Sequence, residues 1–130
     1  MPGTLYLIPN TLGSRDAADP LPDVIPAGVQ QITARLDYIV AEHAKTARAL
    51  LKKLAETTPL ARPLQEITIR ELNVKTPESE LEALLAPVIA GQDAGLMSEA
   101  GVPAVADPGA NLVRLAHRRG VRVKPLVGPS

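Results

Sequence analysis

Cysteine, phenylalanine and tryptophan are absent from the sequence, and tyrosine occurs only twice. Without cysteine the chain has no disulfide, no thiolate chemistry and no cysteine-based zinc site. The two tyrosines, Tyr6 and Tyr38, both sit in apolar runs, so we expect no aromatic platform for stacking unpaired bases. The two histidines are too few for a histidine metal centre. We therefore expect no metal.

Net charge and long apolar runs are missing as well. Fourteen Lys and Arg balance fourteen Asp and Glu, so no global field draws the protein to nucleic acid or to an anionic membrane. No apolar run has the length of a membrane span, and the first residues do not resemble a signal peptide. We expect a cytoplasmic protein without a membrane partner. A length of 130 residues with 45% apolar content predicts one globular domain.

Short β-type runs alternate with helical patterns along the chain. The predicted strands are residues 4–8, 38–41, 67–70, 94–97 and 121–127. The predicted helices are residues 26–32, 44–54, a segment from Thr76 that ends at Gly91, and a segment from Pro108 that ends at Gly120. This alternation predicts an α/β fold in three layers, a mostly parallel five-stranded sheet with helices on both faces. The wetter third strand is predicted near a sheet edge.

The loop after the fourth predicted strand, residues 98–107, is rich in Gly and Pro and carries few charges. In a parallel sheet the loops that leave the carboxyl ends of the strands share one rim, where ligands bind. The other rim segments are residues 9–14, 42–43 and 128–130. Such loops suit a neutral or zwitterionic ligand that is contacted through backbone groups. No Walker loop or G-x-G-x-x-G motif is present, which disfavours the ordinary dinucleotide fold.

Single residues at this rim have structural as well as functional interpretations. Asp107 before a proline predicts a helix cap, and His43 and His117 predict an exposed helix start and a cation at a helix end. Glu42 is open between a solvated acid and a site residue. A triad of Ser98, His43 and Asp107 is disfavoured, because Ser98 lacks a nucleophile elbow.

The helix predicted over residues 44–54 carries its cations away from its apolar stripe. They are Lys45, Arg48, Lys52 and Lys53. A solvated face is the favoured interpretation. RNA contact is the lesser alternative, since the chain has no positive net charge.

Three segments resemble a known family in their order and spacing. They read GTLYLIPNTLG, IVAEHAKTARALLKKL and MSEAGVPAVADPGANLVRLAHRRGVRVKPLVGPS. They resemble the tetrapyrrole methylase superfamily, and most of all its branch of small-subunit ribosomal RNA ribose 2′-O-methyltransferases. That branch typically carries GTLYLVPTPIGN, AEDTR, SDAGTPGISDPG and PGPS. The departures, such as EHAK for EDTR and Glu99 for Asp, resemble a paralogous branch, and the methyl acceptor stays open between RNA and a small molecule.

The resemblance implies S-adenosylmethionine as cofactor, bound in a cleft between two α/β domains. It places nine residues beside the cofactor: Pro9, Asn10, Thr11, Ser98, Glu99, Ala100, Gly101, Val102 and Pro103. Glu42, on the proposed rim, is the candidate catalytic base or substrate contact.

The resemblance also implies a domain arrangement. Residues 128–130 fall where the family's first domain meets its second. We expect residues 1–130 to be the N-terminal domain of a methyltransferase, inactive without the C-terminal domain that this chain lacks. The alternative is a non-catalytic ligand-binding or interaction module, with an exposed apolar face that forms a homodimer.

Overall fold

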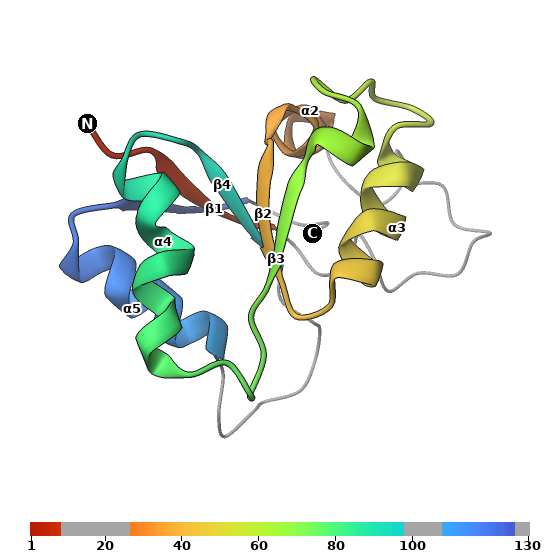
Figure 1. Ribbon diagram of the computed structural model, residues 1–130. Helices are drawn as coiled ribbons and strands as arrows, with labels where there is room; N and C mark the ends of the chain where they lie inside the picture. Colours follow the sequence, from red (N-terminus) through yellow and green to blue (C-terminus); the bar gives the residue numbers. More distant parts are fainter. Residues whose placement is uncertain (9–26, 98–107, 127–130) are drawn as a thin grey trace.

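The computed structural model of the chain describes residues 1–8, 27–97 and 108–126. Its centre is a sheet of five parallel strands in the order β3-β2-β4-β1-β5 (Figure 1). The strands are β1 (Thr4–Ile8), β2 (Tyr38–Ala41), β3 (Thr68–Glu71), β4 (Ala94–Met97) and β5 (Arg122–Pro125). The helices are α2 (Ala27–Arg35), α3 (Ala44–Leu54), α4 (Leu81–Ile89) and α5 (Pro108–Arg118), with 3-10 turns at Leu64–Glu66 and Glu78–Glu80.

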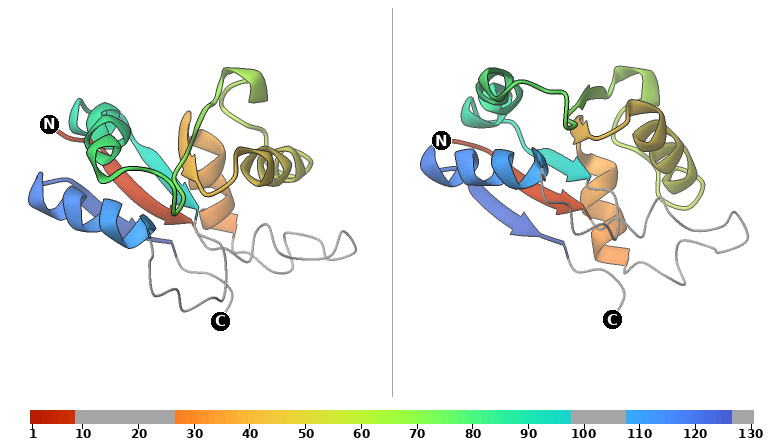
Figure 2. Two further views of the ribbon diagram at one scale, coloured as in Figure 1. Left: turned by 60° about the horizontal axis from the view of Figure 1, so that its bottom comes forward. Right: turned by 90° about the horizontal axis from the view of Figure 1, so that it is seen from below.

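The helices form a layer on each face of the sheet, as Figures 1 and 2 show. Strand residues alternate between the two faces. Ile39 and Ala41 join one buried cluster with α2 and α3, whereas Tyr38 and Val40 join a second cluster with α4 and α5. The predicted three-layer α/β fold with helices on both faces is therefore confirmed.

Gly95 lets the core close around the central strand β4. A Cβ atom at this position would lie 2.4 Å from Ile8 Cδ1 and 2.9 Å from Leu36 Cδ1. Both are ends of flexible side chains, yet Ile8 and Leu36 are themselves buried. The space that a side chain at this position would need is thus occupied by neighbours from β1 and from the segment before β2.

Glycines end the helices α4 and α5, as the sequence predicts. Gly91 has φ +118° and Gly120 has φ +74°, a backbone region that favours glycine. After Gly120, the N–H of Val121 donates to the Ala116 carbonyl at 2.9 Å, which closes the end of α5. Each glycine turns the chain toward the strand that follows.

Some predicted boundaries were wrong. Thr76 does not begin a helix: its hydroxyl accepts from the N–H of Asn73 at 3.0 Å, within a turn, and α4 starts five residues later. The third strand starts and ends one residue later than predicted, because Ile67 closes a 3-10 turn. β3 nevertheless lies at a sheet edge, as predicted. Helix α2 runs to Arg35, three residues beyond the predicted end.

Tyr38 connects the sheet to α4. Its buried hydroxyl donates to the Leu84 carbonyl at 2.5 Å, one turn before Pro87. Burial raises the pKa of the Tyr38 phenol above its usual value, and the nearby positive charge of Arg70 opposes this rise only in part. The neutral phenol is therefore the form that suits this core.

Short polar contacts join the segments at the amino end of the sheet. Thr4 donates its N–H to Asp93 Oδ1 at 2.8 Å. Asp37, just before β2, accepts from Gln92 Nε2 at 2.7 Å and pairs with Arg62 at 3.2 Å. None of the described helices is long and apolar enough to cross a membrane.

Candidate functional site

The carboxyl ends of the parallel strands align at one edge of the sheet and form the rim expected from the sequence. Ile8 at the end of β1 is level with Met97 at the end of β4, and Met97 is level with Ala41 at the end of β2. Ala41 in turn is level with Glu71 at the end of β3. The segments that follow β1, β4 and β2 therefore leave the sheet as direct neighbours.

The helix that follows β4 lies on one face of the sheet, whereas the helices that follow its neighbours β1 and β2 lie on the other face. Helices α2 and α3, which follow β1 and β2, pack on one face of the sheet, while α5, which follows β4, packs on the other. Open α/β sheets bind ligands at such switch points, outside the carboxyl ends of the strands. The end of β4 is thus the topological centre of the candidate site.

The nine residues expected beside the cofactor lie outside the described residues. Pro9, Asn10 and Thr11 follow Ile8 directly, and residues 98–103 follow Met97 directly. Because Ile8 and Met97 are paired in register, the two groups start from adjacent points of the rim. Their contacts remain a prediction.

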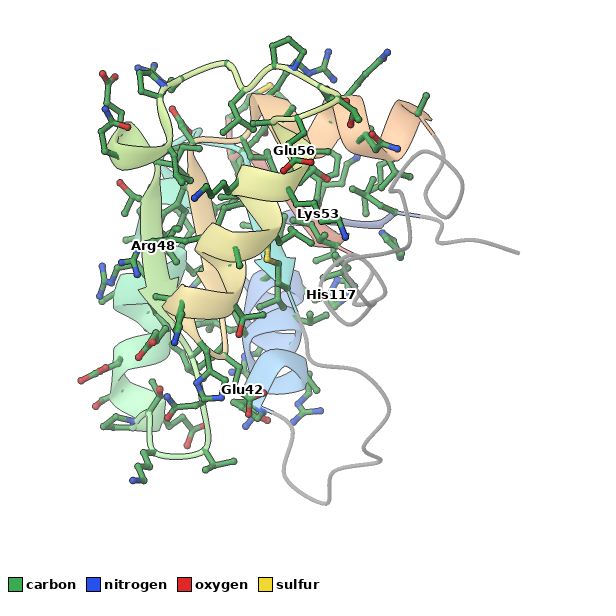
Figure 3. The ribbon with its side chains drawn as sticks, turned by 90° about the vertical axis from the view of Figure 1, so that its right-hand side faces the viewer. Glu42, Arg48, Lys53, Glu56 and His117 are labelled. Carbon is green, nitrogen blue, oxygen red and sulfur yellow. The ribbon has the colours of Figure 1, made fainter. Side chains whose placement is uncertain are left out.

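Glu42 is the predicted site residue that the structure describes. It follows β2 directly, is half-buried, and lies next to the first turn of α3 (Figure 3). Its neighbour Ala41 is paired with Met97. Glu42 therefore stands beside the point where the segment 98–103 begins, on the other side of β4 from β1.

Glu71, at the end of β3, was missed by sequence reasoning. Its Oε2 atom accepts from the N–H of Ala44, the first residue of α3, at 2.9 Å. The carboxylate supplies the cap that His43, at the N-cap position, does not provide through its side chain. The signal that singled out Glu42, an acid directly after a predicted strand, applies equally to Glu71, which directly follows the predicted strand 67–70.

The two histidines lie apart from each other in the sequence and in the fold. His43 is exposed at the start of α3, and His117 is exposed in the last turn of α5, as predicted for both. Ser98 and Asp107 lie outside the described residues, so the disfavoured triad stays untested. Among the described residues, no group of three His, Cys, Asp or Glu could hold a metal ion.

A polar pocket of about 250 Å³ lies at the other end of the sheet. Its lining includes Asp37 and Asp93, which precede β2 and β4. This pocket is at the amino end, away from the rim that carries Glu42. It does not belong to the candidate site.

Comparison with curated proteins finds relatives that align with almost the whole chain. The ribosomal RNA small subunit methyltransferase I of Xylella fastidiosa is 32% identical over 129 residues, which cover 99% of this chain and 41% of the relative. The enzyme of the same name from Escherichia coli O157:H7 is 32% identical over 127 residues, 98% of this chain and 39% of the relative. That from Thermotoga maritima is 34% identical over 95 residues, 73% of this chain and 39% of the relative.

The chain spans about two fifths of the length of the curated relatives it matches. No protein-family model matches it. The alignments nevertheless cover almost the whole chain and with it the three segments on which the resemblance rests. The chain therefore belongs to the tetrapyrrole methylase superfamily, and the relatives that it resembles along almost its whole length are ribosomal RNA small subunit methyltransferases.

Proposed function

We propose that this chain is the N-terminal domain of an S-adenosylmethionine-dependent methyltransferase that acts on ribosomal RNA in the cytoplasm. The observation that carries the proposal is the alignment of 99% of the chain with a ribosomal RNA methyltransferase. The topology supports it, since the two segments expected to bind the cofactor leave adjacent strands, β1 and β4, at a switch point.

In the proposed reaction this chain positions the cofactor and the acceptor. The cofactor supplies an electrophilic methyl group on a sulfonium. The backbone of residues 9–11 and 98–103 would hold it at the end of β4, with a second domain as the other wall of the cleft. Catalysis by such a site comes mainly from orientation, because the transfer joins two bound reactants.

Glu42 is the proposed base or acceptor contact. It lies beside the end of β4 and is half-buried, so a carboxylate there can face a bound nucleophile. As a base it would take the proton of the acceptor hydroxyl as the oxygen gains the methyl group.

The test uses a longer protein that carries this chain together with the second domain. With tritiated cofactor, we expect label to enter small-subunit ribosomal RNA and not small-molecule acceptors. Glu42→Gln should lower the methylation rate by about 10²-fold or more, since general bases typically contribute about 10² to 10⁴. An unchanged rate would remove Glu42 from the reaction. Label that enters only small molecules would overturn the RNA assignment.

We also propose that the 130-residue chain alone binds the cofactor weakly and does not turn over, because one wall of the site would be missing. Isothermal titration calorimetry tests this directly. Micromolar affinity for the isolated chain would contradict it, and the longer protein serves as the positive control.

Exposed large apolar side chains are few among the described residues, namely Met1, Val74 and Ile89, so the enzyme is preferred here over an interaction module.

A further inference from the structure

The outer face of α3 carries cations without acids. Between Ala44 and Leu54 the helix has four Lys and Arg and no Asp or Glu. The ion pairs in the described part of the chain join Arg62 to Asp37 and Arg119 to Glu82, and neither involves α3. A solvated helix usually carries both signs, spaced to pair with each other. The cations of α3 therefore have no ion-pair partner among the described residues.

Three of these cations form one stripe along the helix. Lys45, Arg48 and Lys52 are all exposed, and at 3.6 residues per turn they fall within about 60° of one another. Lys53 is half-buried. It lies about 140° around the helix from Arg48, and Figure 3 shows the two side chains on different sides of α3. We call Lys45, Arg48 and Lys52 the α3 stripe.

The helix dipole does not account for the stripe. Cations stabilise the last turn of a helix, where Lys52 and Lys53 lie. Lys45, however, is in the first turn, at the positive end of the dipole, and that turn holds no acid of its own. Arg48 and Lys52 are four residues apart, a spacing at which like charges repel. Of the three cations only Lys52 is favourably placed in the helix dipole, so the stability of α3 does not explain the stripe as a whole.

The stripe starts at the candidate site. Lys45 is three residues after Glu42, and α3 leads away from the rim toward Glu56 (Figure 3). From Lys45 to Lys52 the helix rises about 10 Å, which is the axial length of about three nucleotides in a helical strand. An anionic polymer bound along the stripe would enter the site beside Glu42.

We infer that the α3 stripe binds the phosphate backbone of the RNA that the enzyme methylates, and so leads the acceptor strand to Glu42. This inference rests on the proposed function. Lysine and arginine contacts to phosphate give affinity and register without reading sequence. Specificity for the methylated nucleotide then belongs to the rim.

The test measures RNA affinity of the 130-residue chain by fluorescence anisotropy with a labelled ribosomal RNA hairpin. Arg48→Glu should weaken binding about tenfold and lower the slope of log K against log salt by about 0.7 to 1. Lys53→Glu is the matched control, with the same charge change on the same helix but off the stripe. It should change the affinity by less than about twofold. Circular dichroism checks that both variants fold, and Arg48→Ala gives a milder second variant.

The outcomes separate this inference from the proposed function. Equal losses of RNA affinity in Arg48→Glu and Lys53→Glu would show that only the overall charge matters, and would overturn the inference. RNA affinity at the wild-type level in both variants would overturn it as well. The inference would also be overturned if the chain bound anionic vesicles and not RNA. If Arg48→Glu left RNA methylation by the longer protein unchanged, the stripe would fail while the proposed function stood. Failure of that protein to methylate any RNA would instead remove the function itself.

Discussion

The two ends of the sheet differ in their polar contacts. At the amino end, segments far apart in the sequence contact each other: the backbone of Gly3 approaches that of Gln92, and the Asp37 carboxylate contacts the side chains of Gln92 and Arg62. At the carboxyl end, Glu42 has no partner within the described part of the chain. The amino end is therefore held together by contacts between distant segments, whereas at the carboxyl end Glu71 caps α3 and Glu42 is without a described partner.

Gly3→Ala gives the largest expected effect, because it attacks the amino end directly. An added Cβ would lie 2.2 Å from the Gln92 carbonyl oxygen, and Gly3 also donates its N–H to the Val88 carbonyl at 2.7 Å. Backbone rather than a side chain must then move, so we expect a loss of about 2–4 kcal/mol in the free energy of unfolding. Urea titration measures it. Gly28→Ala, in α2 with open space around it, should be neutral or stabilising.

Asp37→Ala should cost about 1–2 kcal/mol, because it leaves the Gln92 amide and the Arg62 guanidinium without their shared acceptor. Glu42→Gln at the other end of the sheet should change the unfolding free energy by less than about 0.5 kcal/mol. Thermal unfolding of both variants compares the contributions of the two acids to stability. Equal destabilisation would erase the distinction between the ends.

Tyr38→Phe removes the hydrogen bond to the Leu84 carbonyl and should cost about 1 kcal/mol at pH 8. The pH dependence has a definite sign. The folded-state pKa of Tyr38 is raised by burial, so its contribution is fully present below the unfolded pKa of about 10. It is lost as the pH rises from there through the folded value.

Urea titrations between pH 8 and pH 11 measure this dependence. The wild-type protein should lose stability more steeply above pH 10 than Tyr38→Phe does. Parallel curves would mean that the phenol ionises as easily in the folded as in the unfolded chain.

Lys45→Gln gives the smallest expected effect, and it acts at the carboxyl end. Removing a cation from the first turn of α3 should raise the unfolding free energy by about 0.3 kcal/mol. Lys52→Gln, in the last turn, should lower it by a similar amount. The two melting temperatures then bracket that of the wild-type chain. A stabilising Lys45 would mean that an acid at the rim compensates its charge.

Much of the fold could be predicted from local pattern. Apolar runs gave four of the five strands within a residue at each end, and Gly91 and Gly120 marked the helix ends. The helix start predicted at Thr76 was wrong because the Thr76 hydroxyl accepts a hydrogen bond within a turn. Residues that cap helices are also common in turns. The approach of Gly3 to Gln92 joins residues far apart in the sequence, and no local pattern records such a contact.

The site was predictable to a lesser degree. The rim follows from parallel topology, so Glu42 could be placed there from its position after a strand. Glu71 was missed because its role depends on Ala44 of another segment. The cations of α3 were visible in the sequence, but the structure was needed to show which of them share one face and that none forms an ion pair with an acid of the described residues.

Strand β5 has a consequence for the protein in concentrated solution. It forms one edge of the sheet, exposes Arg122 and Lys124, and ends in Pro125, which has no N–H to offer. An extended segment from another molecule would meet two like charges and a missing donor there. Such edges resist the strand-by-strand growth that leads to amyloid. The sheet should therefore keep to five strands at this side even when molecules are crowded together.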